Sequence, residues 1–350
     1  MKEVDYIVVG LGLAGIAFCE QLERAEKSFF VFESLGPGAS RVAAGLYNPV
    51  ILKRYTLPWK AIEQLDMALP YFEAIGTKIG VSVLEKIPVR KIFSSVEDQN
   101  NWFAASDKPG LSRFVSPSLV PNENQYIDAP FDFGEVQETG RIDIKKLQAG
   151  YQTYLEENAA FAKTNFIHEK LVLVDDGVMY EEYQAKRIVF AEGYGIKDNP
   201  YFQKLPLVGN KGEYLILKAP DLQLTAAIKT SFFIVPLGED VYKVGATFNW
   251  TDKDTLPSKA AKEELLEKFK TLVSCEFEII DQEVGIRPTT GDRRALIGVH
   301  PQYSQLALLN GLGTRGIMAG PMLAQYLFNY LEEGIPLPAE IDIQRFPKKF

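Results

Sequence analysis

The chain has 350 residues, of which 46% are hydrophobic and 24% charged, and its formal net charge is −8 at pH 7. This length buries a large core and favours two domains over one, while the acidic balance argues against a dedicated nucleic-acid surface. Two cysteines are too few for a disulfide framework. We therefore expect a cytoplasmic protein with two buried, reduced thiols, no signal peptide at its start and no membrane span.

The chain opens on a strand, a glycine-rich turn and a helix. Residues 6–9 form a continuous β-prone apolar run, typical of a strand buried on both faces of a parallel sheet. Gly10, Gly12 and Gly15 follow at G-x-G-x-x-G spacing. This spacing permits a tight turn, close approach of a pyrophosphate to the backbone, and close packing of the next helix, expected over residues 13–25. The N-terminus of that helix then faces the phosphates.

A second strand over residues 28–32 ends at Glu33. An acid at this strand tip accepts hydrogen bonds from a ribose diol, so the opening predicts a dinucleotide site. The loop over residues 34–49 is rich in small residues, which let a flat ligand lie against the main chain. A glycine-rich turn in another kind of α/β protein and a merely flexible loop are the alternatives. The motif does not separate NAD from FAD.

Helical and strand periods continue along the chain. Helices are expected at about residues 59–79, 97–106, 143–158, 257–271 and 318–332, with Pro70 kinking or splitting the first. Strands are expected within residues 81–94 and at about 135–140, 166–174, 178–182, 187–190, 212–218, 231–236, 241–248 and 306–309, and a loop over 117–132. The strand at 306–309 leads through the glycine turn GLGTRGI into the last helix, which is a second strand–turn–helix unit.

At this point the chain resembles a known family. The order GLGLAG, Glu33, SRVAAGL, FAEG, KGE, GIRPTTGD and GLGTRGI is similar to that of the D-amino acid oxidase and glycine oxidase superfamily of FAD-dependent oxidoreductases. The C-terminal motifs also resemble the FAD domain of the bifunctional enzyme that processes carboxymethylaminomethyl-uridine in tRNA. The resemblance implies a Rossmann-like FAD-binding domain of the glutathione reductase type and a second, mostly antiparallel α+β substrate domain. The expected boundaries are residues 1–55, 140–205 and 285–350 for the first and 56–139 and 206–284 for the second.

The resemblance also implies where FAD binds. Gly10, Gly12 and Gly15 hold the pyrophosphate, and Glu33 holds the adenosine ribose. The other implied cofactor contacts are Ser34, Ser40, Ala43, Ala44, Gly45, Leu171, Ala191, Glu192, Gly193, Gly313, Thr314, Arg315, Gly316 and Ile317. By this resemblance, the segment from Gly313 to Ile317 places a helix N-terminus at the flavin O2 edge, where it stabilises the negative charge of reduced flavin. Because His168, His300 and Cys275 lie outside the motif positions, non-covalent FAD is expected, and no metal.

By the same resemblance, Arg287 in GIRP grips the substrate carboxylate, which a guanidinium binds in a bidentate manner. The alternative is a structural ion pair with Asp292 or Glu283. Arg315 and Lys211 are further candidates for the site, with structural roles as their alternatives. Aromatic residues that wall the site or belong to the core are Tyr47, Tyr214, Phe233, Phe248 and Trp250.

The implied reaction is oxidation of the C–N bond of an amine or amino acid, by hydride transfer to flavin N5, with oxygen or another electron acceptor. Two alternatives stay open: a stand-alone tRNA-modifying oxidase that removes a carboxymethyl group, and a flavin-binding protein without turnover. An NAD-linked dehydrogenase leaves the second glycine turn without a purpose. The active-site tyrosine lid of the D-amino acid oxidases has no clear counterpart here, so the motifs do not identify the amine, nor do they give the oligomeric state.

Overall fold

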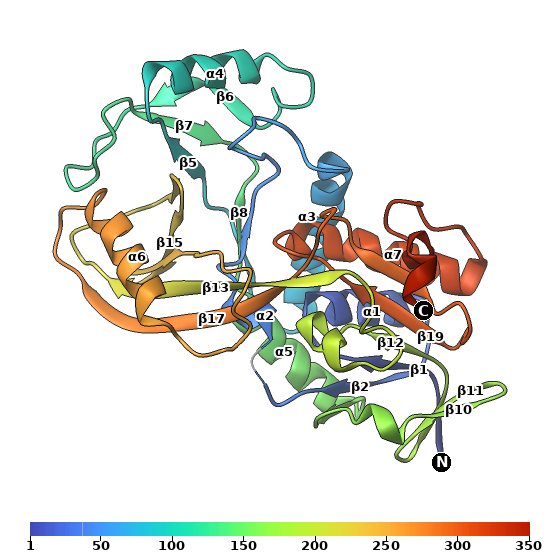
Figure 1. The fold of residues 1–350 in the computed structure, drawn as a ribbon. Helices are drawn as coiled ribbons and strands as arrows, with labels where there is room; N and C mark the ends of the chain where they lie inside the picture. The colour runs from blue at the N-terminus through green and yellow to red at the C-terminus, as the bar shows by residue number, and fades with distance from the viewer. Residues whose placement is uncertain (37) are drawn as a thin grey trace.

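The structure, a computed structural model, describes residues 1–36 and 38–350 and builds them around two eight-stranded sheets and a small three-stranded one (Figure 1). The α-helices are α1 (Leu13–Arg24), α2 (Ala39–Val42), α3 (Ala61–Lys78), α4 (Val96–Ser106), α5 (Ile144–Glu157), α6 (Lys259–Lys270) and α7 (Gly316–Glu333). Short 3₁₀ turns are η1 (His168–Lys170), η2 (Gly193–Asp198), η3 (Ile343–Arg345) and η4 (Pro347–Lys349).

The first sheet is mainly parallel at its centre. Its strands are β10 (Val172–Val174), β11 (Gly177–Tyr180), β12 (Tyr183–Phe190), β1 (Lys2–Val9), β2 (Phe29–Glu33) and β9 (Phe161–Lys163), with β19 (Leu306–Asn310) beside β12 and β18 (Leu296–Val299) beside β19. Strands β2, β1, β12 and β19 all run in the same direction. Their carboxyl ends therefore meet at one edge, which is where ligands bind in open α/β sheets.

The second sheet is antiparallel except where β14 meets β5. Its order is β17 (Glu278–Thr290), β13 (Leu207–Lys218), β16 (Val241–Gly245), β15 (Phe233–Gly238), β14 (Ala227–Lys229), β5 (Val89–Ile92), β7 (Phe133–Val136) and β6 (Val115–Val120). Strands β3 (Leu46–Tyr47), β8 (Gly140–Ile142) and β4 (Leu84–Glu85) form the small sheet. The long pair β13 and β17 runs from the outer part of the molecule to the first sheet (Figure 1).

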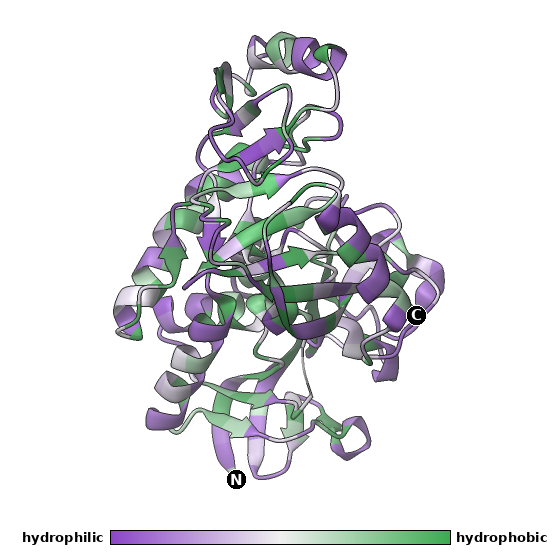
Figure 2. Ribbon diagram, turned by 90° about the vertical axis from the view of Figure 1, so that its left-hand side faces the viewer, coloured by the Kyte–Doolittle hydropathy of each residue, from purple (hydrophilic) through white to green (hydrophobic). Residues whose placement is uncertain are grey.

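Apolar side chains explain the layers. One cluster lies under α1, α3, α5 and α7 on one face of the first sheet and continues to α4 and strands of the second sheet. A second lies on the other face of the first sheet, and a third fills the space between the second sheet and α6. Figure 2 shows hydrophobic residues gathered on the inner strands and hydrophilic ones on the outer turns. Among the described residues, no helix has both the length and the apolar character that a membrane crossing needs.

The fold confirms the α/β class with parallel and antiparallel sheets, and it differs from expectation in several elements. The strand expected at about residues 166–174 is wrong over most of its length, because η1 takes residues 168–170 and only β10 is a strand there. Helix α3 runs unbroken through Pro70, because Leu65, Phe72 and Ile75 are buried around it and hold the helix in place. Strand β6 forms where a loop was expected; Pro117 is tolerated there because β6 is an edge strand with a register shift.

The domain boundaries stay a prediction, and the structure bears on them in one place. The boundary expected at residue 56 assigns α3 to the substrate domain. Helix α3 instead packs against α7, whose own N-terminus follows β19 of the first sheet.

Candidate functional site

One large cavity lies between the carboxyl edge of the first sheet and a face of the second. Its volume is about 730 Å³, which is within the range of ligand and cofactor sites. Residues from both glycine turns line it, namely Gly10, Gly12, Gly313, Thr314, Gly316 and Ile317. The two turns, about 300 residues apart in the chain, thus face a single site.

The first glycine turn is shaped for close approach of a ligand to the backbone. Gly10 has a φ of +101°, and a Cβ there would lie 2.6 Å from the carbonyl oxygen of Ala191. Gly15 does not line the cavity; its role is packing, because a Cβ would lie 1.8 Å from the carbonyl oxygen of Gly10. Gly12 is the N-cap of α1 and has no side chain to cap it; Ser40 Oγ accepts a long hydrogen bond of 3.4 Å from the Leu13 N–H. The positive end of the α1 dipole is therefore left for an anion.

Glu33 lies at the tip of β2 and is only 8% exposed. Its carboxylate accepts a hydrogen bond from the backbone N–H of Leu11, and burial raises its pKa. The predicted lining residues Ser34, Ser40, Ala43, Ala44 and Gly45 follow it around the same cavity. This segment brings the acid and the small-residue loop beside the first glycine turn.

The far end of the cavity includes residues that the sequence did not indicate. Asn165, Phe166 and His168 line it together with the predicted Ala191, Glu192 and Gly193. His168 Nε2 lies 2.8 Å from Glu192 Oε1. Burial opposes protonation of His168, but its hydrogen bond and attraction to Glu192 prevail and raise its pKa. No motif marked this segment, because it follows the three-residue edge strand β9, which has too few residues to show a period.

At the opposite end, the second sheet supplies aromatic and basic side chains. Tyr214, Phe233 and Phe248 line the cavity as expected of walls. Tyr47 is instead buried beside Gly140, and Trp250 is 55% exposed outside the lining. The three wall rings make this end of the cavity apolar, with Phe248 62% exposed at its outer side.

Arg287 projects from β17 into this aromatic end. Its guanidinium lies flat over Gly212 and donates to Asn210 Oδ1 at 2.7 Å, and its Cζ lies 4.8 Å from the Phe248 ring centroid. Nδ2 of Asn210 is buried without a hydrogen-bond partner among the described residues. The cavity thus holds a fixed fork of donors at its apolar end.

The alternative ion pair for Arg287 is not formed. Asp292 instead contacts Arg345 at 3.3 Å, and Glu283 contacts Lys145 and Lys243. Within residues 1–36 and 38–350, no Asp or Glu oxygen lies within 4.0 Å of the Arg287 guanidinium. Its positive charge is therefore available to a bound anion.

Three other predicted site residues lie outside the lining. Lys211 is 1% exposed and donates to Asp252 and Asp254, each at 2.6 Å, so the structure places it in a buried ion cluster. Leu171 is 7% exposed within an apolar core cluster. Arg315 is the N-cap of α7 behind the second turn; burial lowers its pKa, with a further contribution from Arg293. Contacts of these residues with cofactor or substrate stay predictions.

The thiols and the remaining histidine lie away from the cavity. Cys19 and Cys275 are free and buried, and His300 is 6% exposed within an aromatic group that includes Tyr303. Among the described residues, no group of His, Cys, Asp and Glu is placed to hold a metal ion. His168, by contrast, does line the cavity.

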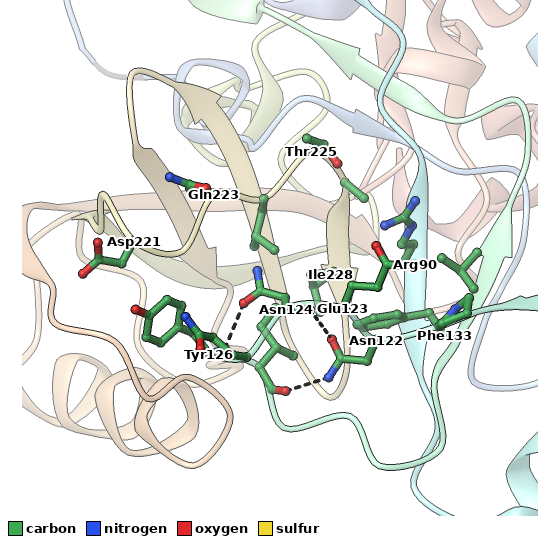
Figure 3. Close-up of a pocket in the computed structure, with 16 residues that line it drawn as sticks. Arg90, Asn122, Glu123, Asn124, Tyr126, Phe133, Asp221, Gln223, Thr225 and Ile228 are labelled. Carbon is green, nitrogen blue, oxygen red and sulfur yellow. Dashed lines mark hydrogen bonds between the residues drawn. The ribbon is translucent and has the colours of Figure 1, made fainter.

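A second, more polar hollow of about 560 Å³ lies on the outer face of the second sheet, between the β6–β7 connection and β14. Its amides are already used: Asn122 Nδ2 donates to the Ile127 carbonyl at 2.8 Å (Figure 3), and Asn124 Nδ2 donates to the Leu222 carbonyl at 2.7 Å. Arg90 pairs with Glu135 at 3.0 Å. We assign no ligand to this hollow.

Both the sequence and the fold are similar to those of known proteins. The model of a family described as FAD dependent oxidoreductase (DAO) matches residues 5–329. A glycine oxidase of Bacillus licheniformis is 32% identical over 354 residues, covering 93% of this chain and 92% of the relative. The crystal structure of glycine oxidase from Geobacillus kaustophilus aligns with a TM-score of 0.82 at 20% identity, covering 97% of each chain.

A further relative matches only in part. The tRNA 5-methylaminomethyl-2-thiouridine biosynthesis bifunctional protein MnmC of Azoarcus sp. is 26% identical over 181 residues, covering 46% of this chain. This chain therefore spans little more than a quarter, 28%, of that protein's length. A crystal structure of iminodiacetate oxidase from Chelativorans sp. aligns with a TM-score of 0.76 at 17% identity, covering 96% of this chain and 97% of that one.

Proposed function

We propose, because the chain belongs to the family of FAD-dependent oxidoreductases, that it oxidises the C–N bond of a small amine or amino acid whose carboxylate is held by Arg287. The observation that carries the carboxylate assignment is the Arg287 guanidinium at the apolar end of the cavity, which has no carboxylate partner among the described residues. Relatives named glycine oxidase, which align over at least 90% of both chains, support the reaction class.

The residues present fit FAD. A Cβ at Gly10 would fill the cradle beside the α1 N-terminus. Oε1 of Gln148, a cavity residue, is buried without a hydrogen-bond partner among the described residues, and a ligand donor would satisfy it. We assign the pyrophosphate to Gly10 and Gly12, the ribose to Glu33 and the flavin to the side of Gly313. The chemistry that FAD supplies when bound is acceptance of a hydride.

The chain's own residues then have three tasks. Arg287 binds the carboxylate and thereby orients the substrate carbon, since a bidentate pair fixes direction as well as distance. Tyr214 and Phe233 exclude water around that carbon. The N-terminus of α7, at Gly316, places positive partial charge beside the cofactor edge where negative charge develops.

The test is an anaerobic panel of amines with and without a carboxylate, in which loss of the oxidised flavin absorbance is followed. Wild-type protein is expected to bleach with carboxylate-bearing amines, and Arg287→Ala to lose that response for carboxylate-bearing amines only. Arg287→Lys, which keeps the charge but not the fork, is expected to recover part of it. Unchanged bleaching in Arg287→Ala rejects the role of Arg287; failure of every amine with wild-type protein favours a flavin-binding protein without turnover.

Two finer points are part of the proposal. Molecular oxygen is proposed as electron acceptor, and hydrogen peroxide production under air tests it. A cytoplasmic location is proposed from the two free, buried thiols, and cell fractionation tests it.

A further inference from the structure

A row of side chains crosses the cavity face of the second sheet. Tyr214 on β13 is in register with Gly245 on β16, and Gly245 with Phe233 on β15. Phe233 is in register with Lys229 on β14. Directly paired residues point to the same side of a sheet. Tyr214, Gly245 and Phe233 line the cavity, so Lys229 continues the row on the cavity face.

The neighbours of Lys229 along its own strand confirm this direction. Side chains alternate between faces along a strand. Ile228 on β14 and Arg90 on β5 line the hollow on the outer face, where Figure 3 shows both. Lys229 and Lys91, the next residues on these paired strands, therefore point the other way.

Lys229 does not itself line the cavity, but it lies next to a residue that does. Its Nζ lies 4.5 Å from the ring centroid of Phe233, which is a wall residue. Contact with a ring face leaves the ammonium hydrogens that point away from the ring free to donate. The ammonium therefore lies directly beside the Phe233 part of the cavity wall.

No acceptor in the described part of the chain neutralises Lys229. Lys91 contacts Asp98, and Lys243 contacts Glu283, both on this face of the sheet. For Lys229, residues 1–36 and 38–350 provide neither a carboxylate oxygen within 4.0 Å nor a hydrogen-bond acceptor for Nζ. Among the described residues, Lys229 and Arg287 are thus both basic groups on this face without a carboxylate partner.

We propose that Lys229 binds a second anionic group of the substrate, so that this enzyme selects dicarboxylic amines, with one carboxylate at Arg287 and the other at Lys229. The assignment deepens, and rests on, the function proposed above. Acidic amino acids and N-carboxymethyl amino acids belong to this class.

The spacing of the two cations agrees with such a substrate. The Arg287 guanidinium lies over Gly212 of β13, and Nζ of Lys229 lies by the Phe233 ring of β15. Only β16 separates β13 from β15. Two strand spacings of about 5 Å each, combined with the two-residue offset of Gly212 from Tyr214 along β13, put the cations about 12 Å apart. A contact of about 3 Å at each end leaves room for two carboxylates joined by a short chain.

The experiment measures ligand binding to the FAD-loaded protein by the change in flavin absorbance, using glutarate and butyrate. Both lack an amine, and they differ by one carboxylate. Wild type is expected to bind glutarate about 10- to 100-fold more tightly than butyrate. Lys229→Met is expected to abolish that preference, and Lys229→Arg to retain it. Lys218→Met, which removes an exposed charge at the end of β13, is the control and is expected to match wild type.

Several outcomes overturn the proposal. These are a wild type with no preference for glutarate, a Lys229→Met protein that keeps the preference, and inorganic phosphate competing as well as glutarate, which would mark a phosphate site. If Lys229→Met fails to retain FAD, Lys229→Gln replaces it in the same measurement.

A second assay separates this proposal from the proposed function. Anaerobic bleaching rates are compared for iminodiacetate and sarcosine. If neither amine bleaches the flavin but glutarate is still preferred through Lys229, the proposed function fails and the second anion site stands. If sarcosine bleaches the flavin and glutarate is not preferred, only the second anion site fails.

Discussion

Adding one methyl group at Gly212 tests the role of Arg287 without changing Arg287 itself. A Cβ at Gly212 would lie 2.1 Å from Nη2 and 2.3 Å from Cζ and Nη1 of Arg287, whereas ordinary contact begins at 3.4 Å. The guanidinium must therefore move by about 1.3 Å, which is the difference between 3.4 and 2.1 Å. That shift breaks the 2.7 Å hydrogen bond to Asn210 and misplaces the fork.

The effect on catalysis can be estimated from the broken hydrogen bond. A hydrogen bond to a charged group contributes about 1.5–3 kcal/mol, so Gly212→Ala is expected to lower kcat/KM for a carboxylate-bearing amine about 10- to 150-fold. Folding should be little affected, because the atoms that yield are the end of a flexible side chain beside a cavity. The Gly212 backbone also lies outside the left-handed region.

The assay is the rate of anaerobic flavin reduction by sarcosine and by ethylmethylamine, which lacks the carboxylate. Gly212→Ala should slow the first and spare the second, with an unchanged thermal midpoint. Gly291→Ala, at an exposed turn with nothing within 4 Å of the added Cβ, is the matched control. Full activity with sarcosine would refute the reasoning, and an equal loss with both amines would show that the shape of the cavity, not Arg287, was disturbed.

Three further outcomes are expected. Gly15→Ala places a Cβ 1.8 Å from the carbonyl oxygen of Gly10. The FAD content should therefore fall, and the free energy of unfolding should fall by more than about 3 kcal/mol. A folded protein with full flavin absorbance would contradict this. Burial, with a smaller contribution from Lys91, lowers the pKa of Lys229 to about 8; Asp98 on α4 pairs with Lys91 and not with Lys229. Between pH 8 and the ordinary pKa near 10.5, Lys229 is protonated in the unfolded chain but not in the folded chain. The free energy of unfolding therefore rises with pH in this range, and the destabilisation caused by burying the charged Lys229 disappears. Lys229→Met should therefore stabilise the protein by up to about 3 kcal/mol at pH 7 and by almost nothing above pH 10.5, and urea unfolding that gives the same difference at both pH values would oppose this account. Acid precipitation should release all FAD into the supernatant, and flavin absorbance retained in the pellet would show a covalent bond.

Much of the cofactor end could be predicted because its signals are local. The first glycine turn, Glu33 and the second glycine turn each follow directly on a strand, and parallel strands bring their carboxyl ends together without further information. Gly10 and Gly313 both have positive φ, a backbone conformation that favours glycine. The glycines in the sequence therefore indicate the shape of these turns directly.

The substrate end could be predicted only in part, because pairing across a sheet is not local. Lys211 and Arg287 look alike in the sequence, each a cation near a glycine. Only the fold brings Asp252 and Asp254 onto Lys211, and only the fold leaves Arg287 without a carboxylate partner in the part of the chain that the structure describes. The same applies to Lys229, whose position on the cavity face depends on register across β15 and β16.

Electrostatics joins the two ends of the substrate site. A cation held away from water without a partner costs stability, and proteins usually pair such a group. This sheet follows that rule at Lys243, where Glu283 supplies the negative charge, and at Lys91, where Asp98 does. Within the described residues it departs from the rule at Arg287 and Lys229, which flank the aromatic walls of one cavity. A fold that neutralises neighbouring lysines has the means to neutralise these two, so the charge that completes them is expected to arrive with the ligand.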